Sequence, residues 1–208
     1  MKEKEKQTPG QRIASSMTDI AEFSKEASKK IIEQGAKIKV VINLMMRVYR
    51  DDERLFVMGR GRSGLVGEAF AMRARHLNFH AHVIGESTTP AVRLDDLVIV
   101  ITGSGVTSTN VALCRTIIKI GAKIIAITSN INSPLARLAD IVIELPGRED
   151  VEAIEDYDKR RLTGEPPLAP LGTFFEINAL TFLDSLICEL MLLTETTEEE
   201  MRKRHAIE

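Results

Sequence analysis

Two short runs rich in glycine and hydroxyl residues, GRGRSG at 59–64 and TGSGVTST at 102–109, are the parts of this chain best suited to bind an anion. Each run follows an apolar segment and precedes a segment with helical spacing, so each predicts a loop between a strand and a helix N-terminus. Glycine lets backbone amides approach an anion, hydroxyls donate to its oxygens, and the helix N-terminus adds the positive end of its dipole. These features together predict a phosphate monoester as the ligand.

The first run also matches the dinucleotide-binding fingerprint Gly-x-Gly-x-x-Gly, with Gly59, Gly61 and Gly64 in the three positions. Glu86 lies 22 residues after Gly64, where an acid that binds a ribose would be expected. A pyrophosphate on the first run, however, would leave the hydroxyls of the second run without a ligand, whereas one sugar phosphate would use both runs. A nicotinamide enzyme is therefore the weaker interpretation.

The elements that must position these runs alternate between strand and helix patterns. Apolar runs predict strands at 54–59, 81–85, 96–103, 123–128 and 140–146. Helical patterns cover 63–77, 107–120, 134–139 and 173–193. Strands that alternate with helices predict an α/β fold, here a three-layer αβα sandwich around a five-stranded parallel sheet.

We interpret the chain as a single domain over residues 1–208. Its expected parts are N-terminal helices over 1–50, strand–helix repeats over 54–146 and C-terminal helices over 172–208. Residues 1–10 are expected to be a frayed tail, and Gly35 is expected to separate two extra helices. Residues 147–171 are charged and then rich in proline, which predicts a long loop of functional importance.

Composition excludes several classes of function. The 208 residues carry a net charge of −2, so no basic surface for nucleic acid is expected. The sequence has no apolar run of the roughly 20 residues that a membrane span needs, and its N-terminus has no apolar stretch typical of a secretion signal. We therefore expect a cytoplasmic protein without nucleic-acid or membrane partners. The two cysteines are not in a CxxC spacing and are expected to be buried free thiols.

The two loops on such a sheet resemble the SIS domain, the sugar isomerase family. Four segments, GRGRSG, GESTTPA at 85–91, LGTFFE at 171–176 and KRHAIE at 203–208, are closer still to the 6-phospho-3-hexuloisomerases within that family. The similarity runs from about residue 12 to the end. It implies a flavodoxin-like topology, a homotetramer, and interconversion of D-arabino-hex-3-ulose 6-phosphate and D-fructose 6-phosphate through a cis-enediol. It also implies that no cofactor and no metal is needed.

The resemblance assigns roles to individual residues. It implies that the substrate phosphate accepts hydrogen bonds from Ser63, Thr102, Ser104 and Thr107. Arg60 and Arg62 are either surface charges or ligands for the phosphate and the enediolate, and their position between glycines favours ligands.

Two residues are candidates for proton transfer. Glu176, in the first turn of a predicted helix, matches the position of the family's catalytic base, but Thr173 and Glu176 also have the spacing of a capping box. His205 lies in a basic C-terminal segment and reads as a solvated residue, whereas the resemblance implies that it reaches an active site, in some relatives across a subunit interface. His80 and His82 share a face of one strand without a third ligand in view, so no metal site is predicted.

Two other functions compete with this hypothesis. One is a phosphosugar-sensing SIS module, which would be expected to carry a further DNA-binding domain. The other is a different sugar-phosphate isomerase of the arabinose-5-phosphate type.

Overall fold

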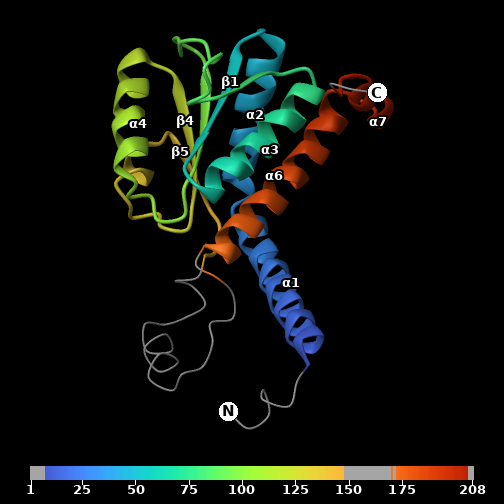
Figure 1. Ribbon diagram of the computed structural model, residues 1–208. Helices are drawn as coiled ribbons and strands as arrows, with labels where there is room; N and C mark the ends of the chain where they lie inside the picture. The colour runs from blue at the N-terminus through green and yellow to red at the C-terminus, as the bar shows by residue number, and fades with distance from the viewer. Residues whose placement is uncertain (1–7, 148–169, 171, 206–208) are drawn as a thin grey trace.

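A five-stranded parallel sheet forms the centre of the computed structural model, which describes residues 8–147, 170 and 172–205 (Figure 1). Its strands are β1 (Arg54–Gly59), β2 (His80–Val83), β3 (Leu97–Ile101), β4 (Lys123–Thr128) and β5 (Ile141–Glu144). Every strand pair is parallel, and the strand order is β2-β1-β3-β4-β5. This is the flavodoxin-like order, so the predicted sheet and its topology are confirmed.

Helices cover both faces of the sheet. They are α1 (Pro9–Glu33), α2 (Gly35–Arg50), α3 (Arg62–His76), α4 (Ser108–Ile120), α6 (Thr173–Leu193), α7 (Glu198–Lys203) and the short 3₁₀ helix η2 (Ala136–Leu138). One face is covered by α2, α3 and α6, and α4 lies on the other (Figure 1). The three-layer sandwich is therefore confirmed.

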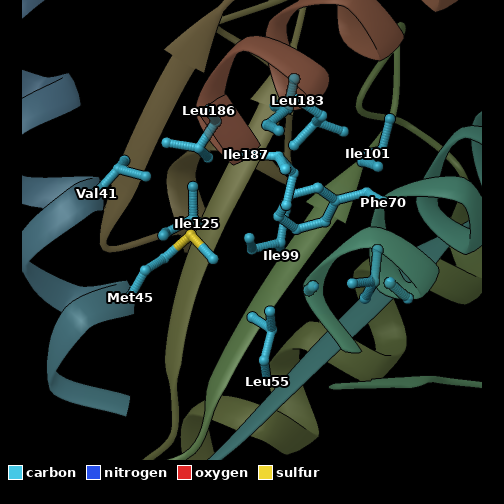
Figure 2. Packing of buried hydrophobic residues seen from close by; sticks show 14 of the residues in the cluster. Val41, Met45, Leu55, Phe70, Ile99, Ile101, Ile125, Leu183, Leu186 and Ile187 are labelled. Carbon is cyan, nitrogen blue, oxygen red and sulfur yellow. The ribbon is translucent and has the colours of Figure 1, made fainter. Parts of the chain in front are cut away.

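Strands buried on both faces explain the continuous apolar runs in the sequence. Side chains at alternate positions point to opposite faces, so Leu55 and Val57 belong to one core cluster and Phe56 and Met58 to the other. In the first cluster, side chains of α2, α3 and α6 pack over β3 and β4, as Figure 2 shows for Met45, Phe70 and Ile187 around Ile99 and Ile125. These two hydrophobic cores hold the sheet in place, and both predicted phosphate loops leave the carboxyl edge of that sheet.

The first helix begins earlier than expected. Thr8 caps α1 in a capping box with Gln11, and Pro9 occupies the first turn, so the prediction of a frayed tail is wrong for residues 8–10. The second half of α1 packs on α6, where the rings of Phe23 and Phe174 lie 4.5 Å apart. The first half extends away from the sheet (Figure 1), and it exposes Ile13 by 62% and Met17 by 66%.

The remaining local predictions have mixed outcomes. Gly121 ends α4 in the left-handed conformation. The helix predicted at 134–139 is only the 3₁₀ turn η2, and the Ser133 hydroxyl accepts from the amide of Ala136 there. Cys114 is buried, which raises the pKa of its thiol to about 11, but Cys188 is exposed and the prediction for it is wrong. Most of the predicted loop 147–171 lies outside the described residues. Within the described ranges, no helix is long and apolar enough to cross a membrane.

Candidate active site

The topology places a crevice at the carboxyl ends of β1 and β3. After β1 the chain goes to β2 on one side, and it returns to β3 on the other, so the order of strands reverses between these two. Ligands of open parallel sheets bind outside such a switch point. Gly59 pairs with Ile101 at the ends of β1 and β3, so both predicted phosphate loops leave the sheet from the same place.

Three helices begin at this edge without a capping side chain. The N-cap residues of α3, α4 and α6 are Gly61, Thr107 and Gly172, and none of them makes a side-chain cap hydrogen bond in the described structure. By contrast, α1 and α7 both have complete capping boxes, with Thr8 and Thr197 as N-caps. The uncapped ends leave backbone amide donors and positive dipole ends for an anion.

The loop after β1 depends on two glycines. A Cβ on Gly59 would lie 2.7 Å from the carbonyl carbon and oxygen of Ser63, because the first turn of α3 passes directly over the end of β1. Gly61 has φ 57° and ψ −135°, a backbone conformation that is essentially restricted to glycine. Ser63, in the first turn of α3, is half-buried, and Arg60 is exposed.

The residues of the loop after β3 that are predicted to bind phosphate differ in their exposure to solvent. Ser104 is exposed and Thr107 half-buried, so both are open to a ligand. Thr102 is 4% exposed, and its hydroxyl accepts from the amide of Gly105 at 3.2 Å, which closes the loop on itself. The phosphate roles of Ser63, Thr102, Ser104 and Thr107 remain predictions.

The structure brings together two of the predicted site residues, Arg62 and Glu176. The Arg62 Nε donates to the Glu176 carboxylate, so the first turns of α3 and α6 meet at the crevice. The Glu176 side chain is 12% exposed and that of Arg62 is 62% exposed. The capping-box interpretation of Glu176 is wrong, because the N-cap of α6 is Gly172 and Thr173 is already helical.

His205 lies far from this pair in the same subunit. Its ring packs on that of His76, with centroids 4.2 Å apart, and the Arg204 guanidinium donates to the carbonyl oxygen of His76 at 2.7 Å. His76 is the last residue of α3, whereas Arg62 is the first, and a helix of that length spans about 20 Å. One subunit therefore does not bring His205 to its own Glu176.

The other histidines have structural contacts. His76 is buried, and burial, followed by the charges of His205, Arg73 and Arg204, lowers its pKa. His80 pairs with Asp52 at 2.9 Å, and the His82 ring lies against Phe56. Among the described residues, no group of three or more histidine, cysteine or carboxylate side chains is arranged to hold a metal ion.

Sequence reasoning missed the residues that support the second loop. Thr128 and Ser129, at the end of β4, both donate to the carbonyl oxygen of Gly103. The polar run TSN that follows the apolar strand KIIAI was the available signal, because polar residues at the carboxyl end of a parallel strand face the crevice. The contact between Gly103 and the ring of Phe175, from distant parts of the chain, had no signal in the sequence.

Comparison with known protein families identifies one match. The model of the SIS domain matches residues 48–156, which include all five strands and both loops.

Relatives and solved structures extend the similarity over most of the chain. An uncharacterized protein from Aeropyrum pernix is 43% identical, over 93% of this chain and 91% of its own. A 3-hexulose-6-phosphate isomerase from Methylomonas aminofaciens is 41% identical, over 74% of this chain and 79% of its own. The crystal structure of a protein from Methanococcus jannaschii, for which the function of 3-hexulose-6-phosphate isomerase was inferred, superimposes with a TM-score of 0.72 at 30% identity. That match covers 94% of this chain and 97% of the other.

The tight passage of α3 over Gly59 gives a testable prediction. In Gly59→Ala the new Cβ meets backbone atoms that cannot rotate away, so the N-terminus of α3 must shift, at a cost of about 1 to 3 kcal/mol in stability. We expect the variant to fold but to lose the stabilisation that inorganic phosphate gives the wild type in thermal unfolding. Gly35→Ala is the matched control, because a Cβ there meets nothing within 4 Å. Equal phosphate stabilisation of Gly59→Ala and the control would contradict the proposed role of this loop.

Proposed function

The chain belongs to the SIS domain family, and we propose that it is a sugar-phosphate isomerase that interconverts D-arabino-hex-3-ulose 6-phosphate and D-fructose 6-phosphate. One observation carries the proposal. A carboxylate that is almost buried, Glu176, lies beside the basic Arg62 at the same sheet edge as two glycine and hydroxyl loops. A base, a cation and an anion anchor in one crevice are what this isomerisation needs.

The two loops hold the substrate phosphate in this proposal. Hydroxyls of Ser63, Ser104 and Thr107 and the uncapped amides of α3 and α4 donate to its oxygens. Thr102 supports the turn from beneath through its bond with Gly105. An anchored phosphate fixes the register of the sugar carbons, so that C2 and C3 of the open-chain sugar lie at the carboxylate.

Glu176 transfers the proton. From the 3-ketose it takes the proton on C2, the C2–C3 double bond of the cis-enediol forms, and the electron pair moves to the oxygen on C3. The same carboxyl group then returns the proton to C3, the hydroxyl proton on the C2 oxygen passes to the C3 oxygen, and C2 becomes the new carbonyl carbon. The sugar is oxidised at C2 and reduced at C3 by equal amounts, so this route requires no redox cofactor, and in this scheme an arginine rather than a metal ion supplies the positive charge for the enediolate.

The arginines supply positive charge in this scheme. Arg62 orients the Glu176 carboxylate in the free protein, and its exposed guanidinium is able to turn toward the enediolate oxygens. Arg60 is exposed two residues earlier in the loop, and in this proposal it contacts the sugar phosphate from the solvent side.

We further propose that His205 acts in the site of a partner subunit within a homotetramer. The distance between the ends of α3 separates His205 from Glu176 in one chain, so the two residues meet only across an interface. The exposed apolar side chains of Ile13 and Met17 on α1 are available for such an interface. The imidazole at the site exchanges protons with the sugar hydroxyls or helps the fructose 6-phosphate ring to open.

Replacing the base tests the proposed function. Glu176→Gln keeps the shape and a hydrogen-bond acceptor for Arg62 but removes the proton acceptor, so isomerisation should slow by about 10² to 10⁴-fold. Stability should change little, because the Arg62 partner is largely solvated. Glu189→Gln is the matched control, since it makes the same change at an exposed position of α6. A Glu176→Gln protein that isomerises fructose 6-phosphate at the wild-type rate would exclude the role of this carboxylate.

Mixed oligomers test the subunit that provides the histidine. Glu176→Gln and His205→Asn chains should each be inactive alone. When they are refolded together, about a quarter of the sites in random mixed oligomers should pair an intact Glu176 with an intact neighbouring His205. Part of the activity should therefore return.

The control mixes Glu176→Gln chains with chains that carry both changes, and it should stay inactive. Light scattering and native mass measurements should show that mixed tetramers form. If mixed oligomers form without activity, His205 does not act on the neighbouring site.

A further inference from the structure

A single carbonyl in the second loop, that of Gly103, accepts three hydrogen bonds from the end of β4. The hydroxyls of Thr128 and Ser129 each donate to it at 2.9 Å, and the Ser129 amide donates at 3.1 Å. A carbonyl oxygen has two lone pairs, so three donors saturate it. The Gly103 peptide is therefore held by two side-chain hydrogen bonds in addition to the backbone hydrogen bond from Ser129.

The orientation of that peptide determines where the next amide points. In a trans peptide the C=O and N–H bonds point in opposite directions, and the peptide bonds of the described chain include no cis bond. Because the Gly103 oxygen faces β4, the N–H of Ser104 faces away from β4. The Ser104 amide makes no hydrogen bond to any described residue, so it is presented as a donor to a ligand.

The same glycine also contacts the start of α6. A Cβ on Gly103 would lie 3.2 Å from Cδ1 of Phe175, which is buried and directly precedes Glu176. Gly103 thus lies between the end of β4 and the residue next to the proposed base. The Gly103 peptide is therefore enclosed between the end of β4 and the ring of Phe175.

Thr128 is itself fixed in place. Its side chain is fully buried, and its hydroxyl accepts from the amide of Asn130 at 3.1 Å while donating to Gly103. With both of its hydrogen-bonding directions defined, the hydroxyl has one orientation. The Thr128 hydroxyl therefore holds the Gly103 carbonyl, and with it the loop, in one position.

We propose that Thr128 and Ser129 are positioning residues, whose hydroxyls preorganise the loop 102–107 and thereby set the affinity of the site for the substrate phosphate. Their hydroxyls donate to the loop, and the phosphate is bound by donors of the loop itself. The proposal rests on the proposed function for the identity of the ligand. Preorganised donors bind an anion without the entropic cost of ordering the loop on binding.

Kinetics of matched variants test this proposal. In Thr128→Val and in Ser129→Ala, KM for fructose 6-phosphate and the inhibition constant for inorganic phosphate should each rise by about three- to tenfold, the effect of one lost hydrogen bond. The turnover number kcat should stay within about twofold, because phosphate binding contributes to ground state and transition state alike. Thr128→Ser keeps the hydroxyl and should restore KM to near the wild-type value.

Thr116→Val is the control, because it removes a threonine hydroxyl that donates to a helix carbonyl of α4 on the exposed surface. Phosphate binding measured by calorimetry separates the two proposals. A protein that binds phosphate more weakly in Thr128→Val and Ser129→Ala, yet does not isomerise fructose 6-phosphate, supports the positioning role and refutes the proposed reaction.

Unchanged KM and phosphate affinity in folded Thr128→Val and Ser129→Ala would overturn the positioning role. So would a Thr128→Ser variant as impaired as Thr128→Val, since packing rather than the hydroxyl would then be responsible. If Thr128→Val does not fold, Ser129→Ala and Thr128→Ser decide the question by the same measurements.

Discussion

The helix N-termini without a side-chain cap, at the carboxyl edge of the sheet, are the feature on which the proposed site depends. In the described part of the chain, three helices begin there without a side-chain cap, around Gly61, Thr107 and Gly172. Concentrating such donors and positive dipole ends is unfavourable unless an anion compensates them. The rigid apolar sheet, the tight passage over Gly59 and the hydrogen bonds on the Gly103 carbonyl all keep these ends in place. In the proposed site, these backbone amides bind the phosphate together with the loop hydroxyls, and a few side chains carry out the proton transfer.

The length of α3 separates the two proposed catalytic groups. Its first residue, Arg62, orients Glu176, and its last residue, His76, supports the ring of His205. Because one helix carries both supports, a subunit holds the proposed base, Glu176, near one end of α3 and His205 about 20 Å away near the other. If His205 serves a neighbour, as we propose, α3 links two sites of the oligomer mechanically.

The parts predictable from the sequence were those governed by local periodicity. The strands of the sheet follow from continuous apolar runs, and helical spacing located α3, α4 and α6 correctly. The start of α1 was misjudged, because Thr8 and Pro9 are helix-start signals inside a charged, apparently featureless tail.

The sequence indicated only those parts of the candidate site whose residues lie within a single loop. Glycine and hydroxyl runs indicated both phosphate loops, but the pairing of Arg62 with Glu176 joins positions 114 residues apart and depends on tertiary packing. The same spacing that suggested a capping box at Thr173 was misleading, since the helix begins at Thr173 itself, one residue earlier than that motif requires. The three hydrogen bonds on Gly103 depend likewise on how β4 lies beside β3.

Position-specific deuterium exchange is the most direct test of the proposed chemistry. When the protein is incubated with fructose 6-phosphate in deuterium oxide, removal and return of the proton at C3 should introduce deuterium at that carbon. Nuclear magnetic resonance should therefore show label at C3 in the wild-type reaction. Label confined to C1 would instead indicate an aldose–ketose isomerase, and a protein that binds the sugar without any exchange would be a sensor. Either result would contradict the proposed isomerisation between C2 and C3.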